Sequence, residues 1–260
     1  MKCAIEDVMR SAGALMLSFE HPEVREKSAH ANFVTQADVA VQDFLMERLA
    51  ARWPEARFFA EEKDDNVLSD GLTFIIDPID GTLNYLRGRA CSAVSVGAVE
   101  NGRAVFGAIY DPYRNMLFHA ERGHGAWCGD ERLHVSDVLC EHAVVSMGTA
   151  HYIEGTLEKT ARSVAGILAH FGDLRRLGAA TRDLTDLACG MSEGSFEWML
   201  QPWDYCAGSL LVEEAGGRCG NIMGGEITFA HAIPFMAATP RCFDALQRVL
   251  QQAADEAEAK

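Results

Sequence analysis

Apolar residues recur along this chain with two different spacings, and their alternation predicts a mixed α/β protein. Helical spacing runs over residues 5–19 and again over residues 39–49. Short apolar runs between polar turns then predict strands over residues 57–60, 73–76, 93–99, 104–110 and 116–120. Asn101-Gly102 separates two of these strands and is a strong hairpin signal, so the sheet is not purely parallel.

The second half of the chain alternates between helices and strands. Strands are predicted over residues 144–147, 195–200 and 235–238, and helices over 153–171, 182–189, 207–215 and 241–253. Gly216-Gly217 signals the end of the third of these helices. With no internal repeat or low-complexity linker, the pattern predicts a layered α/β protein with mixed sheets, in one large domain or two closely packed lobes.

Composition narrows the classes of partner. The chain has 260 residues, 48% of them hydrophobic, and a net charge of −15. This charge argues against a nucleic-acid backbone or an anionic membrane as partner, and an anionic substrate would need a local cation such as Mg²⁺. No apolar run approaches the length of a membrane span, and Glu6 and Asp7 stand where a signal peptide would be apolar. Eight scattered cysteines without a Cys-x-x-Cys pair argue against zinc and predict reduced thiols in a cytoplasmic protein.

Residues 77–82, with the sequence Asp-Pro-Ile-Asp-Gly-Thr, carry the strongest chemical signal. They follow an apolar run that predicts a buried strand, and packing does not account for two carboxylates, a glycine and a threonine at its end. Asp77 and Asp80 can converge on one hard cation, and a helix starting near Gly81 would offer free amides to an anion. This combination is typical of Mg²⁺-assisted phosphate chemistry. The alternative is a plain strand-to-loop turn, because Asp-Pro and Asp-Gly are common turn dipeptides.

Three further carboxylates have the right chemistry, and each has a structural alternative. Glu61 ends a short apolar strand and can point into the same cleft as Asp77, or it belongs to a solvated acidic loop. Asp204 opens a predicted helix, where an acid is also common for electrostatic reasons alone. Asp38 follows Thr35 at the start of another predicted helix, and either residue is a candidate cap.

Taken together, these pieces resemble the inositol monophosphatase family, a branch of the lithium-sensitive, Mg²⁺-dependent sugar phosphatases. The matching segments come in the family's order and spacing and cover nearly the whole chain: residues 33–38, 61–62, 77–84 and 203–204, with weaker support from 123–126, 178–180 and 213–217. The resemblance implies a layered α/β/α/β/α sugar-phosphatase fold in a single domain, residues 1–260. Its two lobes would span roughly 1–140 and 141–260, with the active site between them. The resemblance also implies a homodimer.

The resemblance further implies two to three Mg²⁺ ions per active site. Glu61, Asp77 and the carbonyl of Ile79 would hold one ion. Asp77, Asp80 and Asp204 would hold a second, and Glu61 would help to place a weaker third.

The remaining site residues are also implied by the resemblance. Thr82 and Asp38 would orient and deprotonate the attacking water, with Glu61 as the third catalytic residue. Lys27 matches a family lysine near the metals, and Glu197 aligns with a family acid that binds substrate hydroxyls. The amides of Gly81 and Thr82 would cradle the phosphate. The expected substrate contacts are Asp80, Gly81, Thr82, Ala180, Glu197 and Asp204.

The reaction implied is hydrolysis of inositol monophosphate or a related sugar or polyol phosphate by a metal-activated water. Fructose-1,6-bisphosphatase, histidinol-phosphatase and NADP phosphatase activities of the same superfamily are alternatives, and a non-catalytic binding or regulatory protein is an alternative of another class. Haloacid-dehalogenase phosphatases are disfavoured, because the two acids of their Asp-x-Asp-Gly-Thr motif stand one residue closer and near the N-terminus. Two departures bear on the substrate. Ala60 stands where the family usually has glycine, and Trp198 is expected to narrow or reshape the sugar pocket.

Overall fold

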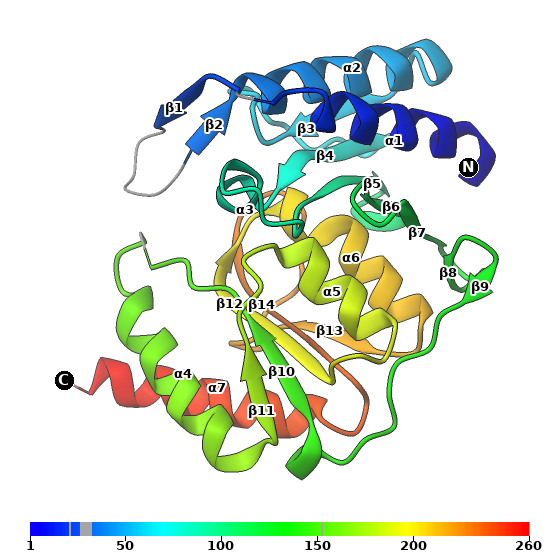
Figure 1. Cartoon of the computed structure of the whole chain (residues 1–260). Helices are drawn as coiled ribbons and strands as arrows, with labels where there is room; N and C mark the ends of the chain where they lie inside the picture. Colours follow the sequence, from blue (N-terminus) through cyan, green and yellow to red (C-terminus); the bar gives the residue numbers. More distant parts are fainter. Residues whose placement is uncertain (21, 27–32, 152, 260) are drawn as a thin grey trace.

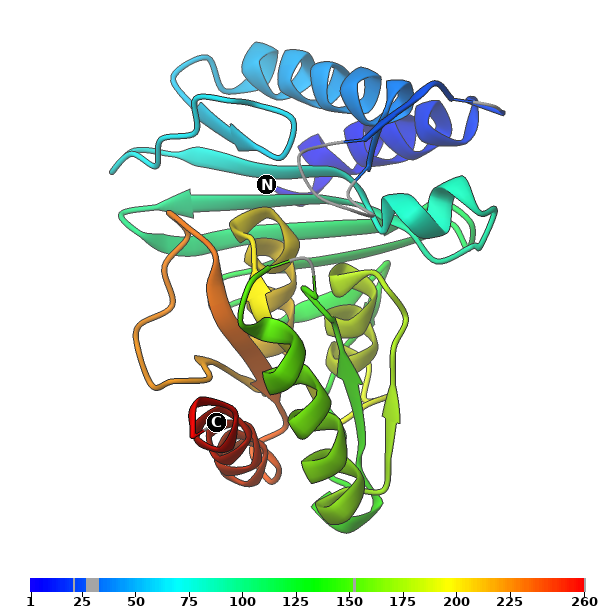
Figure 2. The same cartoon turned by 90° about the vertical axis from the view of Figure 1, so that its left-hand side faces the viewer.

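Five stacked layers make up the described residues, 1–20, 22–26, 33–151 and 153–259, of this computed structural model (Figure 1 and Figure 2). Helices α1 (Lys2–Leu17) and α2 (Gln36–Arg52) cover the outer face of a seven-stranded sheet. Between that sheet and a five-stranded one lie α5 (Ala180–Ala188) and α6 (Pro202–Glu214). The outer face of the second sheet is covered by α4 (Thr156–His170) and α7 (Phe243–Glu258). The expected α/β/α/β/α arrangement is therefore confirmed.

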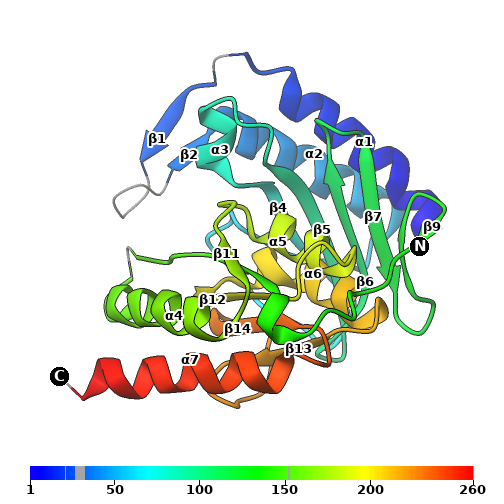
Figure 3. The same ribbon diagram turned by 60° about the horizontal axis from the view of Figure 1, so that its bottom comes forward.

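The seven-stranded sheet follows chain order from one edge to the other. Its strands are β3 (Arg57–Ala60), β4 (Thr73–Asp80), β5 (Ala93–Glu100), β6 (Arg103–Asp111), β7 (Met116–Glu121), β8 (Ala126–Cys128) and β9 (Glu131–Arg132). Only β3 and β4 pair in parallel. Figure 3 shows β4 to β7 side by side under α1 and α2. Because helices cover both of its faces, β4 is buried along its whole length, which explains its continuous apolar run.

The five-stranded sheet is mixed, with the order β11-β10-β12-β14-β13. Its strands are β10 (Val144–Met147), β11 (Asp173–Arg175), β12 (Gly194–Leu200), β13 (Arg218–Asn221) and β14 (Ile233–Ala238). Strands β1 (Val24–Glu26) and β2 (Phe33–Thr35) form a separate antiparallel pair, α3 (Thr82–Leu86) is a short helix, and residues Cys140–His142 form a 3₁₀ turn. The predicted strands and long helices are present, with ends shifted by a few residues. The short strands β1, β2, β8, β9, β11 and β13 were not predicted, because most of them lack a continuous apolar run like those of the equally short β3 and β10, and β8 has only three residues.

Two glycines set how closely α6 approaches the first sheet. Gly97 and Gly107 stand opposite each other on β5 and β6. A Cβ at Gly107 would lie 2.7 Å from the Ala207 carbonyl oxygen, and one at Gly97 would clash with the side chain of Cys206. Without side chains at these two positions, the helix backbone packs directly on the strands. This close packing brings the start of α6 to the end of β4.

Local signals place the candidate acids at strand ends and helix starts. The pairing of β4 with β5 shifts register between Asp77 and Asp80. Asp38 and Asp204 are the third residues of α2 and α6, and each closes a capping box with the residue before its helix. Within the described residues, no helix is long and apolar enough to cross a membrane.

Candidate active site

Three aspartates converge at the junction of the first sheet and α6. Carboxylate oxygens of Asp77, Asp80 and Asp204 all lie within 4.8 Å of one another. Asp77 and Asp80 are 1% and 7% exposed, so the strand-to-loop turn is a buried structure. The three residues that the sequence suggested as ligands of one ion are thus brought together.

The carboxylates of this cluster carry the same charge and repel one another. Burial first, and then the charge of Glu61, raise the pKa of Asp77 well above its usual range. Burial and the charge of Asp80 do the same to the pKa of Asp204. Burial also raises the pKa of Asp80, although hydrogen bonds from Thr181 and Ala180 act in the opposite direction. A bound divalent cation would remove this repulsion, and an all-oxygen donor set suits Mg²⁺.

Backbone amides fix the orientation of two of these carboxylates. The Ile79 amide donates to Asp77 Oδ1 at 2.9 Å. The Gln201 amide donates to Asp204 Oδ2 at 3.0 Å, as part of the capping box of α6. Each side chain therefore keeps its second oxygen for a cation.

Asp80 is oriented by the first turn of α5. The Thr181 amide donates to Oδ2 at 2.7 Å, the Thr181 hydroxyl also donates to Oδ2, and the Ala180 amide donates to Oδ1 at 3.3 Å. Ala180 was expected to donate to a substrate hydroxyl. In this structure its amide donates to Asp80 instead.

Glu61 and the Ile79 carbonyl complete the expected ligand set. Glu61 follows β3 directly, its amide donates to the Ile76 carbonyl at 3.1 Å, and it lines the same cleft as Asp80 and Asp204. It is therefore part of the cleft wall, and not of a solvated loop. The Ile79 carbonyl accepts the Thr82 hydroxyl at 3.2 Å.

The start of α3 brings a hydroxyl into the site. Gly81 precedes α3 in a left-handed conformation with φ of 81°, and a Cβ there would lie 3.0 Å from the Cys91 carbonyl oxygen, which explains the need for glycine. This turn places the Thr82 hydroxyl 3.4 Å from Asp38 Oδ1, across 44 residues of sequence. The predicted Thr82–Asp38 contact is thus present.

The cleft beside the cluster has an open volume of about 200 Å³. Its lining includes Glu61, Asp80, Gly81, Thr82, Ala180, Glu197 and Asp204, which are the expected catalytic and substrate residues other than Asp38. Asp38 is fully buried behind Thr82.

Glu197 lies in the cleft wall on β12. The Ala150 amide donates to its Oε1 at 3.0 Å, and any side chain at Gly148 would clash with its carboxylate. Burial raises the pKa of Glu197 to about 7, against the opposing effect of the Ala150 amide. Ala150 has a positive φ of 31°, so a strained loop holds this acid in place.

The expectation that Trp198 shapes the sugar pocket is wrong. Successive residues of a strand point to opposite faces, so Trp198 faces away from the cleft that Glu197 lines. It is 4% exposed, packs in the core beneath α4 and α7, and donates from Nε1 to Ser163 Oγ at 3.1 Å.

Sequence reasoning missed several residues of the cleft. Asp183 on α5 lines it with one oxygen that has no hydrogen-bond partner among the described residues, and burial raises its pKa well above the usual range. Arg176 and His151 also line the cleft. Asp183 and the neighbouring Arg182 were detectable as charges inside a helical run, but the run alone does not say which face is buried. Lys27 lies outside the described residues.

Comparisons with known proteins agree with this architecture. A family model described as the inositol monophosphatase family matches residues 1–256. Inositol-1-monophosphatase of Bacillus subtilis is 31% identical over 238 residues, 89% of each chain. Nus factor SuhB of Salmonella typhimurium is 30% identical over 247 residues, 94% of this chain and 92% of that protein. The crystal structure of extragenic suppressor protein suhB from Bartonella henselae has a TM-score of 0.89 and 31% identity, and the match covers 96% of this chain and 98% of that one.

Proposed function

This chain belongs to the inositol monophosphatase family, and we propose that it is a Mg²⁺-dependent phosphomonoester hydrolase acting on inositol monophosphate or a related sugar or polyol phosphate. The observation that carries the proposal is the convergence of Asp77, Asp80 and Asp204. Thr82, with its hydroxyl next to Asp38, lines the same cleft as two of these acids. A cation site and a group that can orient water therefore lie together.

The proposed metal ligands are the three converging aspartates together with Glu61 and the Ile79 carbonyl. Glu61, Asp77 and the Ile79 carbonyl would hold one Mg²⁺, and Asp77, Asp80 and Asp204 a second. When bound, Mg²⁺ lowers the pKa of water and neutralises charge on the phosphoryl group. The amides that orient Asp77 and Asp204 keep these ligands in place before an ion arrives.

Proton transfer is assigned to Thr82 and Asp38. When the Thr82 hydroxyl donates to Asp38, its oxygen can accept a hydrogen bond from water in the cleft. Asp38 is then the base that receives the proton relayed through Thr82, and Glu61 lines the same cleft as the third catalytic residue. The amides of Gly81 and Thr82 would donate hydrogen bonds to the phosphate of the substrate. This division of roles suits a displacement that needs mainly positioning and charge neutralisation.

The substrate class rests on Glu197. Its carboxylate lines the cleft together with Asp204, and one oxygen is already held by the Ala150 amide. The other oxygen is free to accept from a hydroxyl of a polyol, with Asp80 as a further contact. This acid supports a hydroxyl-rich leaving group over a plain aryl or alkyl one.

There are two groups of alternatives. Fructose-1,6-bisphosphatase, histidinol-phosphatase and NADP phosphatase activities use the same type of centre and differ in the leaving group. A relative named Nus factor SuhB makes a non-catalytic role the second candidate. The complete set of acids supports hydrolysis, because a purely binding role does not require four carboxylates beside a Thr–Asp pair.

Other features expected from the resemblance stay predictions. They are the homodimer, the cytoplasmic location, the number of bound ions, and one domain with lobes at roughly 1–140 and 141–260. Size-exclusion chromatography with light scattering tests the first, and a species of 28.4 kDa would contradict it.

The test of the function is phosphate release from a panel of phosphate esters in the presence of Mg²⁺. The panel holds inositol 1-phosphate, fructose 1,6-bisphosphate, histidinol phosphate, NADP and 4-nitrophenyl phosphate. We expect inositol 1-phosphate or another polyol phosphate to have the highest kcat/KM. A folded, Mn²⁺-binding protein that releases no phosphate from any of them would contradict hydrolysis and favour the binding role.

A further inference from the structure

Asp80 depends for its orientation on a helix that begins 100 residues further along the chain. Both of its carboxylate oxygens accept hydrogen bonds from the first two residues of α5, Ala180 and Thr181. These donors are backbone amides and a short hydroxyl, so they move with the helix. If α5 shifted, they could not keep their hydrogen bonds to the Asp80 carboxylate. The geometry of Asp80 is therefore set by where α5 begins.

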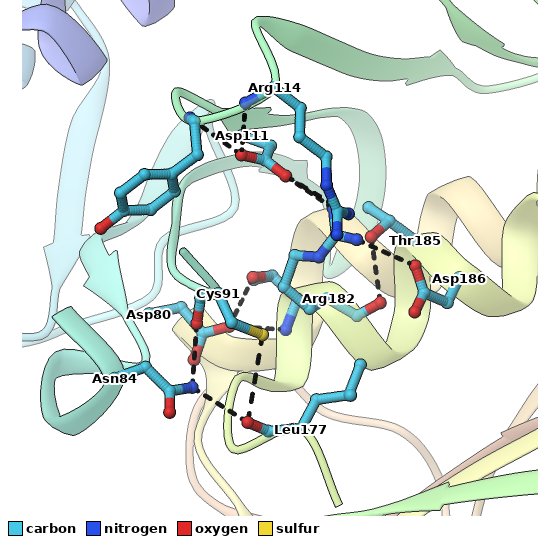
Figure 4. Close-up of polar contacts among 11 residues, drawn as sticks. Asp80, Asn84, Cys91, Asp111, Arg114, Leu177, Arg182, Thr185 and Asp186 are labelled. Atoms are coloured by element: carbon cyan, nitrogen blue, oxygen red, sulfur yellow. Dashed lines mark hydrogen bonds and ion pairs between the residues drawn. The ribbon is translucent and has the colours of Figure 1, made fainter. Parts of the chain in front are cut away.

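The next residue of α5 forms a buried bridge to the first sheet (Figure 4). The Arg182 guanidinium donates to Asp111 Oδ2 at 2.9 Å and to Asp186 Oδ1 at 3.1 Å. Arg182 is 4% exposed and Asp111 is 1% exposed. Asp186 lies one turn along the same helix, so of these two hydrogen bonds it is the one to Asp111 that links α5 to another element.

The far end of the bridge is fixed to the seven-stranded sheet. Asp111 is the last residue of β6, and its Oδ1 accepts the amides of Tyr113 and Arg114 at 3.0 and 3.1 Å. The Arg114 guanidinium lies 3.7 Å from Oδ2. Because Asp111 is held by its own turn, Arg182 connects α5 to a rigid point.

A second tie holds the loop that precedes α5. Asn84 Nδ2 lies 2.9 Å from the Leu177 carbonyl oxygen and 3.1 Å from that of Gly178. Asn84 belongs to α3, the helix that Thr82 begins. Asp80 thus lies between two sets of polar contacts, Arg182–Asp111 and Asn84 with the loop before α5, and Figure 4 shows both.

Stability alone does not account for a buried arginine here. Replacing a buried ion pair by apolar residues of similar volume is often neutral or stabilising, because both charges must be removed from water. Neighbouring positions of α5 carry buried leucines, such as Leu184, so an apolar side chain suits this layer. What the guanidinium adds is two fixed hydrogen-bond directions, which specify the position of the helix.

We propose that Arg182 is a positioning residue for the metal centre. Its bridge to Asp111 holds the first turn of α5 so that the amides there orient Asp80 for the second ion. This inference rests on the metal site proposed above, but not on any substrate.

Mn²⁺ binding to the 260-residue chain, monitored by electron paramagnetic resonance, tests the proposal without turnover. Changing an outer partner of a metal ligand typically costs 10–100-fold in metal affinity. Arg182→Leu should therefore weaken one class of bound Mn²⁺ at least tenfold and leave the class held by Glu61 and Asp77 within about twofold. Asp186→Asn removes the charge of the other partner of Arg182, which lies on the same helix, and should leave both classes unchanged.

A double-mutant cycle separates positioning from a general structural role. If Arg182 acts through Asp80, Arg182→Leu should have no further effect on Mn²⁺ affinity in an Asp80→Asn background. Independent, additive losses would overturn the proposal, and so would an Arg182→Leu variant that binds both ions like the wild type. If that variant does not fold, Asp111→Asn keeps the turn acceptor and weakens the bridge, together with the exposed Arg114 ion pair. It should then show the same selective loss, and unchanged binding would overturn the proposal.

The test of the Arg182 role can be distinguished from the test of the proposed hydrolase function. A wild-type protein that binds Mn²⁺ but hydrolyses no ester would contradict the hydrolase, while the cycle would still decide the role of Arg182. Normal hydrolysis with unaltered metal binding in the Arg182 variants would contradict only the positioning role.

Discussion

The hydroxyl of Thr82 lies 3.4 Å from Asp38 Oδ1 and 3.2 Å from the Ile79 carbonyl oxygen. Asp38 Oδ2 accepts both the amide and the hydroxyl of Thr35, so the carboxylate is held from behind by the cap of α2. A hydroxyl has one proton and donates to one of its acceptors at a time. Asp38, the third residue of α2, and Thr82, the first residue of α3, thus form an acceptor–donor pair of which Thr82 faces the cleft.

Replacing Thr82 tests this pair. Thr82→Ala should lower kcat by about 10²–10⁴-fold with little change in KM, because general-base arrangements contribute on that scale. Thr82→Ser keeps the hydroxyl and should retain most of the activity. Steady-state kinetics on one polyol phosphate are sufficient, and a loss confined to KM would mean that Thr82 only binds phosphate.

Asp77→Asn should nearly abolish turnover and leave the fold intact. Metal ions contribute several kcal/mol to catalysis, so a loss of roughly 10³-fold or more in kcat is expected. The amide side chain keeps an oxygen for the Ile79 amide and removes one charge from the repelling cluster. Calorimetry in EDTA should therefore show a Tm no lower than that of the wild type. Asp204→Asn, the matched variant, should weaken one ion only, and a clear fall in Tm for Asp77→Asn would indicate a structural role.

The metal-free protein should lose stability as pH rises. Burial raises the pKa of Asp77 and Asp204 well above the usual range and that of Glu197 to about 7. Between the unfolded and folded pKa values, such acids bind more protons in the folded state, so the free energy of unfolding falls as pH increases. Thermal melting in EDTA from about pH 5 to about pH 8 should show a decreasing Tm. Mg²⁺ should raise Tm most at the upper end, and a Tm in EDTA that rises with pH would contradict the burial of these charges.

Glu197→Gln tests the substrate class. The variant keeps the shape of the side chain but loses a charged acceptor, and hydrogen bonds to charged groups contribute about 1.5–3 kcal/mol. For a hydroxyl-rich phosphate, kcat/KM should fall roughly tenfold or more. Hydrolysis of an aryl phosphate, which lacks those hydroxyls, should hardly change. Equal losses on both substrates would place Glu197 in the metal centre or the fold, and no loss on either would remove the main support for a polyol.

Residues whose surroundings are local could be predicted from the sequence. The hairpin at Asn101-Gly102 has both residues at positive φ, 51° and 72°, as that turn requires. Thr35 caps α2 by accepting hydrogen bonds from amides two and three residues further along the chain. The apolar run predicted the strand β4, and this strand ends within the Asp-Pro-Ile-Asp-Gly-Thr motif. Such features depend on a few consecutive residues, so their pattern is visible in one chain.

Residues whose partners lie far along the chain could not be predicted. Arg182 meets Asp111 across 71 residues, and nothing in either segment indicates the other. Trp198 was assigned to the pocket because it departs from the family's usual pattern beside Glu197. Adjacent strand residues point to opposite faces, however, and the position of β12 between two helical layers decides which face is the cleft. Asp183 was missed for a similar reason, since a helix packed between two sheets buries polar positions as well as apolar ones.

The central claim is that this acidic cleft hydrolyses phosphate esters only with a divalent cation bound. The most direct measurement is the rate of phosphate release from inositol 1-phosphate by EDTA-treated protein as Mg²⁺ is added back, with Asp77→Asn measured in parallel. We predict no turnover in EDTA, full recovery with Mg²⁺ in the wild type, and none in the variant. Full activity in EDTA, or an Asp77→Asn variant as active as the wild type, would contradict the account.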